Sequence, residues 1–118
     1  MKILIIDDEE DIAKSIQLFL KDAGFDADIS LSGKAALKKI PKYGLILLDL
    51  LMPDLSGRQI LAEMRKKSIK VPAIVITSAG LPNAVRSEIQ SYYPGTGFVS
   101  KPNLREDLLG EIKGVLKK

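Results

Sequence analysis

Four short apolar segments and a fifth, more polar one alternate along the chain with longer stretches in which apolar residues recur every three or four positions. The short segments are residues 2–6, 26–30, 45–48, 73–77 and 98–100. Runs of this length, rich in Ile, Leu and Val, are typical of strands buried on both faces, as in parallel sheets. The pattern therefore predicts five parallel strands, of which the second is the least apolar.

The stretches between these segments carry the start and stop signals of helices. Apolar residues at helical spacing run from Ile12 to Ala23, and Gly24 is a C-terminal stop. The remaining signals are Ser32 as a cap and Pro41 as a stop for the second helix, a Ser56/Gln59 capping box for the third, Pro82 in the first turn of the fourth, and an Asn103/Glu106 cap for a fifth that runs to Leu116.

Five strand–helix units follow one another without a linker, a repeat or a low-complexity segment. This alternation predicts one α/β domain over residues 1–118, with a parallel sheet covered by helices on both faces. A closed barrel needs eight units, so we expect an open, doubly wound sheet. In such sheets, ligands bind beyond the carboxyl ends of the strands.

Two missing residue types exclude whole classes of site. The 118-residue chain contains no Cys and no His, which excludes disulfide scaffolds, Cys-ligated zinc, iron–sulfur clusters and thiol catalysis. Ser/His/Asp triads, haem ligation by His and a phosphohistidine on this chain are excluded too. Any chemistry must therefore run on carboxylates, Lys, Ser, Thr and backbone groups.

Charge and hydropathy are typical of a soluble domain. The 18 basic and 15 acidic side chains give a net charge of +3, and only 5% of residues are aromatic. Solvated helix faces explain the basic residues better than a nucleic-acid interface does, and stacking platforms for bases are scarce. No apolar run approaches the roughly 20 residues of a membrane span. We expect a cytoplasmic domain that binds neither membrane nor nucleic acid directly.

Polar side chains stand at the ends of four of the five predicted strands. Asp7 and Asp8 follow the first strand, Asp49 the third, Thr77 closes the fourth and Lys101 follows the fifth. Because the carboxyl ends of parallel strands share one edge of a sheet, these groups should converge there. Aspartates brought together repel one another unless a cation neutralises them. Mg²⁺ prefers oxygen ligands of this kind.

A metal, a lysine and a hydroxyl around a carboxylate describe a phosphoryl-transfer site. The positive groups would neutralise the phosphoryl oxygens while a carboxylate attacks phosphorus. Asp49 is the best candidate for the nucleophile because it ends the most apolar strand. Asp7 and Asp8 are better placed as metal ligands.

The same residues resemble the receiver domain of two-component response regulators, of which the single-domain chemotaxis regulators are the simplest. The resemblance covers essentially the whole chain and includes Met52-Pro53 and Gly57 after Asp49, and Lys101-Pro102 after the fifth strand. It implies a flavodoxin-like sheet with strand order 2-1-3-4-5 and five helices. It also implies Asp49 as phosphoacceptor, Mg²⁺ held by Asp7, Asp8, Asp49 and the Leu51 carbonyl, Thr77 and Lys101 on the phosphoryl oxygens, Phe98 as the switch aromatic, and a cis peptide between Lys101 and Pro102.

The implied function is a signalling switch rather than an enzyme in the usual sense. A sensor histidine kinase or a histidine phosphotransfer protein would donate the phosphoryl group, and the surface of helix four, strand five and helix five would change. That surface would act on a protein target or a fused output domain, or form a phosphorylation-dependent homodimer. The chain would catalyse only its own phosphorylation and a slow dephosphorylation, since neither Leu51 nor Ala79 offers an acid or amide to orient water.

Three other functions fit the sequence less well. A haloacid-dehalogenase-like phosphatase needs a second acid two residues after the nucleophile, where Leu51 stands. A dinucleotide-binding module needs a glycine-rich first turn, which is acidic here. A degenerate receiver that serves only as an interaction module remains an alternative. Within the resemblance, Asn103 replaces a frequent Phe, and residues 91–97 are bulkier than is usual at the end of helix four.

Overall fold

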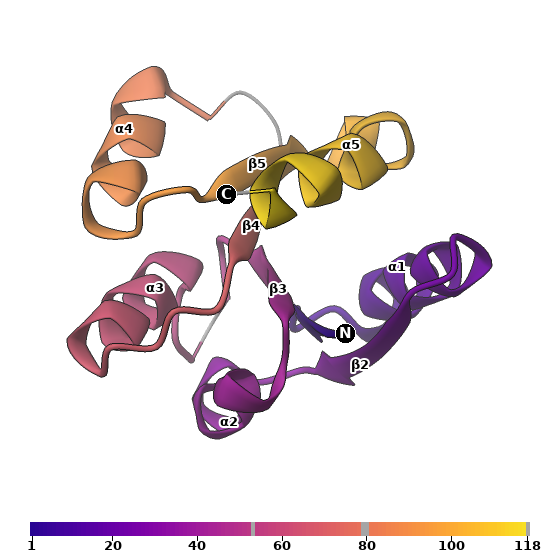
Figure 1. Ribbon diagram of the computed structural model, residues 1–118, viewed down its shortest axis with the longest axis horizontal. Helices are drawn as coiled ribbons and strands as arrows, with labels where there is room; N and C mark the ends of the chain where they lie inside the picture. Colours follow the sequence, from indigo (N-terminus) through magenta and orange to yellow (C-terminus); the bar gives the residue numbers. More distant parts are fainter. Residues whose placement is uncertain (53, 79–80, 118) are drawn as a thin grey trace.

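The computed structural model describes residues 1–52, 54–78 and 81–117, with one strand–helix alternation throughout (Figure 1). The strands are β1 (Lys2–Ile6), β2 (Asp26–Ser30), β3 (Leu45–Asp49), β4 (Ala73–Thr77) and β5 (Gly97–Ser100). The α-helices are α1 (Glu10–Asp22), α2 (Gly33–Lys39), α3 (Gly57–Lys66), α4 (Asn83–Tyr92) and α5 (Leu104–Leu116). Single 3-10 turns follow α2 and precede α5 at Ile40–Lys42 and Lys101–Asn103.

All strand pairs are parallel and lie in the order β2-β1-β3-β4-β5. This confirms the doubly wound sheet with strand order 2-1-3-4-5. The crossover from β1 to β2 and back to β3 makes β1 and β3 neighbours, with Ile6 opposite Leu48. Their carboxyl ends therefore lie side by side, at the point where the winding of the sheet reverses.

Two apolar cores explain why the central strands β1, β3 and β4 are apolar at every position except Lys2, Asp49 and Thr77 at their ends. Alternate side chains of a strand point to opposite faces of the sheet. In β3, Leu45 and Leu47 pack with α1 and α5, whereas Ile46 and Leu48 pack with α2, α3 and α4. Figure 1 shows these two helical layers on either side of the sheet. Both faces are covered, so β1, β3 and β4 lose any solvated side.

The helix ends follow the local signals in most places. The Ser56/Gln59 capping box forms in full, and the Ser32 hydroxyl accepts a hydrogen bond from the amide of Ala35 at 3.3 Å. Gly24 follows α1 with a φ of +91°, a conformation that favours glycine. Within the described ranges, no helix is long and apolar enough to span a bilayer.

The α-helix α2 ends at Lys39 with Ile40 as its C-cap, as Pro41 predicted, and a 3-10 turn that contains Pro41 follows it. Two local predictions are wrong. Pro82 is the N-cap of α4 rather than a residue of its first turn. Asn103 makes no side-chain cap bond, because its backbone (φ −107°, ψ 15°) is not extended as a capping residue requires.

The predicted cis peptide between Lys101 and Pro102 is also wrong, since the structure contains no cis peptide bond in its described part. Here Pro102 belongs to the 3-10 turn Lys101–Asn103, next to the start of α5. A trans proline suits the first turn of a helical segment, and the trans form of an X–Pro bond is favoured by about 0.5–1 kcal/mol.

Candidate functional site

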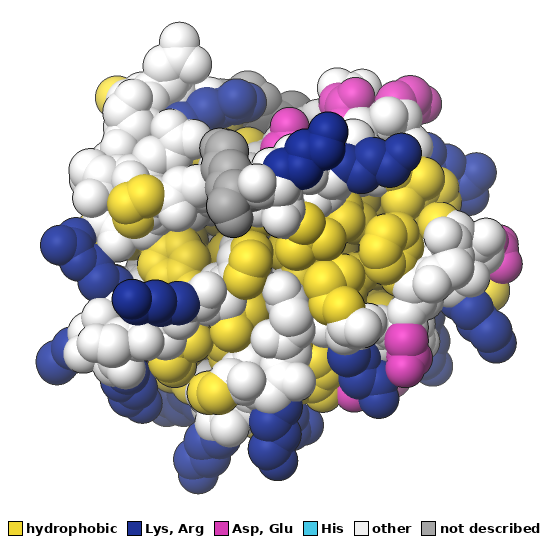
Figure 2. Space-filling model, in the orientation of Figure 1, with side chains coloured by type: hydrophobic (Ala, Val, Ile, Leu, Met, Phe, Trp, Pro, Cys, Tyr) yellow, Lys and Arg dark blue, Asp and Glu magenta, His cyan; other side chains and the backbone are white. Residues whose placement is uncertain are grey.

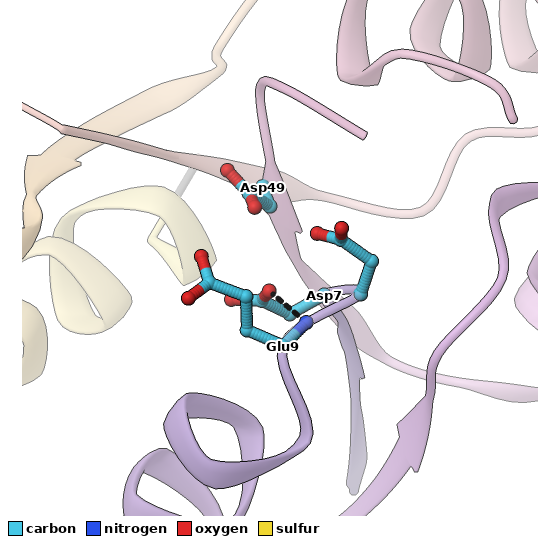
Figure 3. A group of neighbouring side chains, drawn as sticks. Asp7, Glu9 and Asp49 are labelled. Atoms are coloured by element: carbon cyan, nitrogen blue, oxygen red, sulfur yellow. Dashed lines mark hydrogen bonds between the residues drawn. The ribbon is translucent and has the colours of Figure 1, made fainter. Parts of the chain in front are cut away.

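Asp7 and Asp49 lie next to each other at the carboxyl edge of the sheet. Asp49 is the last residue of β3, and Asp7 follows β1, the strand beside it. Both are buried, with exposed fractions of 1% and 5%. Figure 3 shows the side chains of Asp7, Glu9 and Asp49 as neighbours at this edge.

Four acidic side chains form one cluster at this edge. One carboxylate oxygen each of Asp7, Asp8, Glu9 and Asp49 lies within 4.8 Å of the others, and Asp8 and Glu9 are exposed. The amide of Glu9 donates a hydrogen bond of 2.9 Å to Oδ1 of Asp7, drawn dashed in Figure 3. The sequence predicted this convergence for the three aspartates but did not assign Glu9 to it. Its only signal was its position directly after the Asp7-Asp8 pair.

Lys101, which directly follows β5, brings a positive charge to the acidic cluster. Its Nζ lies 3.7 Å from Oδ2 of Asp49 and 3.4 Å from Oε1 of Glu9. Partial burial lowers the pKa of Lys101, but the charges of Asp49, Asp7 and Glu9 outweigh this effect and raise the pKa overall. The ammonium group therefore stays charged at neutral pH.

One lysine does not neutralise the acidic cluster. Burial is the largest cause that raises the pKa of Asp49 to about 6, followed by the charge of Asp7. Burial also raises the pKa of Asp7, whose Oδ2 is buried without a hydrogen-bond partner in the described chain. A buried carboxylate oxygen without a partner is costly. The cluster thus offers carboxylate oxygens as ligands and carries negative charge that Lys101 does not compensate. Both properties suit a hard divalent cation.

A cavity of about 370 Å³ opens above Asp49 and joins the other predicted residues to the cluster. Thr77, Ser78 and Lys101 line it together with Asp49 and Glu9. Thr77 is almost fully buried, with an exposed fraction of 6%. The structure therefore brings Asp7, Asp8, Asp49, Thr77 and Lys101 to one place. Two further residues of the sequence motifs, Pro53 and Ala79, lie outside the described residues.

The loop after Asp49 is held by contacts that the sequence did not reveal. The amide of Leu51 donates to Oδ1 of Asp49 at 3.3 Å, while the Leu51 side chain is 72% exposed. Asp54 accepts hydrogen bonds from the hydroxyl of Ser32 at 2.8 Å and the amide of Lys34 at 3.2 Å. A Cβ on Gly57 would stand 2.7 Å from the carbonyl oxygen of Asp49, so only glycine lets α3 start this close to the site.

Phe98 lies on β5 with its ring half-buried and packs against the core on the α4 side. The guanidinium of Arg86, on α4, lies over the ring at 5.4 Å from its centre. A cation at this distance from an aromatic face is attracted by the ring. Arg86 therefore ties α4 to Phe98, a contact that the sequence did not indicate.

Asp49→Asn is expected to stabilise the chain at pH 7.5 in EDTA by an amount on the order of 1–2 kcal/mol. The pKa of Asp49 lies above that of an unfolded aspartate, so folding takes up a proton between pH 4 and 6. The free energy of unfolding then falls as pH rises through this window and stays lower above it. The gain from the substitution should therefore disappear towards pH 4.

Urea unfolding at pH 4, 5, 6 and 7.5 measures this effect. The chain has no His, so among side chains with ordinary pKa values none titrates between pH 5 and 8. Asp22→Asn, at an exposed aspartate at the end of α1, is the matched control for the same substitution outside the acidic cluster. If Asp49→Asn changes the free energy of unfolding by the same amount at pH 4 and pH 7.5, the pKa of Asp49 is not raised in the folded chain.

The whole chain is similar to known proteins of one family. The family model for the response regulator receiver domain matches residues 3–113. The probable transcriptional regulator ycf29 of Porphyra purpurea is 34% identical over 119 residues, which are 97% of this chain and 56% of that protein. The cell cycle response regulator CtrA of Brucella ovis is 31% identical over 121 residues, 100% of this chain and 51% of that protein.

A solved structure agrees with these relatives. The receiver domain of the Francisella response regulator 1452 superposes with a TM-score of 0.87 at 27% identity, covering 98% of this chain and 96% of that one. The chain spans about half the length of the curated relatives it matches. Sequence and fold thus agree over almost every residue, and the chain belongs to the response regulator receiver domains of two-component signalling.

Proposed function

We propose that this receiver domain is a phosphorylatable switch that accepts a phosphoryl group on Asp49 from a histidine kinase or a histidine phosphotransfer protein. The observation that carries the proposal is the pairing of buried Asp49 with Lys101 in a cavity that also contains Thr77. The cavity leaves room above the carboxylate, and Asp49, Lys101 and Thr77 each have a use in phosphoryl transfer. A degenerate interaction module would not need all of them.

In this proposal a carboxylate oxygen of Asp49 attacks phosphorus, the new P–O bond forms, and the bond from phosphorus to the donor's imidazole nitrogen breaks. The imidazole leaves with the bonding electron pair. Lys101 stabilises negative charge on a phosphoryl oxygen, and the Thr77 hydroxyl donates a hydrogen bond to another. The donor must be another molecule, since this chain has no His.

Asp7, Asp8, Asp49 and the backbone carbonyl of Leu51 would hold Mg²⁺. When bound, the ion supplies Lewis-acid stabilisation of the phosphoryl oxygens. The buried Asp7 oxygen without a partner and the raised pKa of Asp49 support this site, because both reflect an excess of negative charge. Glu9 lies within the same cluster and keeps Lys101 close to it.

The output would be a changed surface on α4, β5 and α5, read by a protein target, by a second copy of the chain or by an output domain joined to this one. The relatives of twice the length are consistent with a joined domain. The expected site of action is cytoplasmic. The phosphoryl group is expected to be long-lived because neither Leu51, which is 72% exposed and lines the cavity, nor Ala79 offers an acid or amide to orient water.

The experiment that tests this function is the Mg²⁺ dependence of phosphorylation. Incubated with acetyl phosphate and Mg²⁺, the chain should gain one phosphoryl group, and EDTA should abolish the gain. Without a phosphodonor, saturating Mg²⁺ should raise the melting temperature by about 3–6 °C, because it binds only the folded cluster.

Asp8→Ala should remove this metal-induced shift. Glu10→Ala is the matched control: Glu10 lies two residues away, is exposed and pairs with Lys14 rather than with the cluster. The variant Glu10→Ala should keep the full shift. An unchanged shift in Asp8→Ala would place the metal elsewhere.

Phe98→Ala should leave phosphorylation of Asp49 intact but uncouple it from α4 and α5. The switch requires the Phe98 ring to change position when Thr77 is drawn to the phosphoryl group. Beryllofluoride with Mg²⁺ should therefore shift the amide signals of residues 84–113 in the wild type and far fewer in Phe98→Ala. Arg86→Met, which removes the cation over the ring, should shift these signals part of the way without beryllofluoride. Equal responses in the wild type and Phe98→Ala would contradict the switch.

A further inference from the structure

A second cavity, of about 570 Å³, lies away from the acidic cluster, between the connection from α3 to β4 and the connection from α4 to β5. It adjoins Ala73, the first residue of β4, whereas Asp49 and Thr77 end their strands. Figure 2 shows apolar side chains at the surface over the region between α3 and α4, with Lys and Arg beside them. None of its lining residues belongs to the cavity above Asp49.

The two walls of this cavity are apolar and partly aromatic. Ile69, Val71 and Pro72 form the wall that leads into β4. Tyr92, Tyr93 and Pro94 form the wall at the end of α4. The second wall belongs to the segment 91–97, which the sequence comparison with the receiver family marked as unusually bulky. That segment therefore has a structural consequence, because it builds one side of a cavity.

Tyr93 ties the two walls together. Its side chain is buried, and its hydroxyl lies within hydrogen-bonding distance of two carbonyl oxygens on the opposite wall, those of Ile69 at 3.1 Å and Val71 at 2.5 Å. Burial raises the pKa of Tyr93 to about 12, so the hydroxyl keeps its proton and can donate. A cavity whose walls are tied in this way is preformed, as ligand sites usually are.

The charged residues around the opening are all basic. Arg65 and Lys70 line the cavity and are exposed, and Ser68 and Ser91 add hydroxyls at the rim. Among the described residues that line it, there is no Asp or Glu. The cavity thus combines a largely apolar interior with a positive rim, which favours an apolar ligand that carries negative charge.

We propose that this cavity is a binding site for a small aromatic carboxylate. The ring would lie between the Val71–Pro72 wall and Tyr92, and the carboxylate would face Arg65 and Lys70. The volume lies within the range of about 300–1,000 Å³ that small-molecule sites occupy. The inference is independent of phosphoryl transfer, since it uses none of the residues around Asp49.

The test is a titration of the whole chain with 2-naphthoate, followed by amide signals in ¹⁵N-correlation spectra. We expect saturable shifts concentrated in residues 68–73 and 91–95. The uncharged analogue 2-naphthamide, which has the same rings, should shift the same signals but bind about two- to fivefold more weakly, since exposed charge pairs contribute that much. Asp49→Asn should bind 2-naphthoate like the wild type, which separates this result from the fate of the proposed function.

Variants that remove basic side chains distinguish the effect of the rim from that of the net charge of the chain. Arg65→Gln with Lys70→Gln should weaken the binding of 2-naphthoate by about two- to fivefold and leave the binding of 2-naphthamide unchanged. Lys66→Gln with Lys67→Gln is the control, because it removes the same charge from adjacent residues that do not line the cavity. Shifts that do not saturate, that centre on other residues, or that are equally strong for both probes would overturn the proposal.

Discussion

Asp49→Asn should gain no phosphoryl group from acetyl phosphate in Mg²⁺, under conditions in which the wild type gains one. The amide keeps the shape of the side chain at the end of β3 but is not a nucleophile, so no acyl phosphate can form. Intact-mass spectrometry measures the incorporation, and peptide mapping locates it. The decay of the wild-type signal after removal of the donor tests the expected slow dephosphorylation.

Asp54→Asn is the matched control for this substitution. Asp54 lies on the loop directly after Asp49, but its carboxylate faces Ser32 and the start of α2, which lower its pKa to about 2. The variant should be phosphorylated like the wild type, even if it is less stable. Incorporation at the wild-type level in Asp49→Asn would show that another residue is the acceptor.

Lys101→Met should lower the rate of phosphorylation by about 100-fold. Removal of one preorganised hydrogen-bond donor that stabilises transition-state charge has an effect of this size in enzymes. The Nζ of Lys101 is 3.7 Å from Oδ2 of Asp49, close enough to reach a phosphoryl oxygen bound there. Methionine keeps much of the apolar stem and removes the charge. Initial rates at saturating Mg²⁺ measure the effect.

Lys113→Met, in the last turn of α5, removes an equal charge at an exposed position remote from the cavity. It should change the rate by less than about twofold, because screened surface charges act weakly at a distance. A Lys101→Met rate within twofold of the wild type would exclude a direct role for the ammonium group. The Asp49 assignment would stand in either case.

Much of the candidate site was predictable because it follows from strand ends. Asp7, Asp49, Thr77 and Lys101 each end or follow an apolar run, and parallel strands bring such positions to one edge. Glu9, Asp54 and Arg86 were not predictable in the same way. Glu9 meets Lys101 across 92 positions of sequence, and Asp54 meets Ser32 across 22. Such pairings depend on rotamers and loop paths that local sequence does not specify.

Two errors have the same origin in small energy differences. The isomer of the Lys101–Pro102 bond depends on about 0.5–1 kcal/mol, which the surrounding structure can outweigh in either direction. A cap at Asn103 depends on an extended backbone, and the 3-10 turn before α5 removes it. A short motif indicates only a preference for a cis peptide or a helix cap. Whether the backbone between β5 and α5 can adopt that conformation depends on how these two elements pack.

The sequence by itself determined the five parallel strands, the two helical layers and the edge of the sheet where chemistry can collect. The reason is that a strand buried on both faces must be apolar throughout, which leaves polar residues only at its end. Tertiary structure alone decided how far burial raises the pKa of Asp49, which carboxylates share Lys101, and that residues 91–95 and 69–73 line one cavity. These properties depend on distances between elements, which vary by a few ångströms without any change in the hydrophobic pattern.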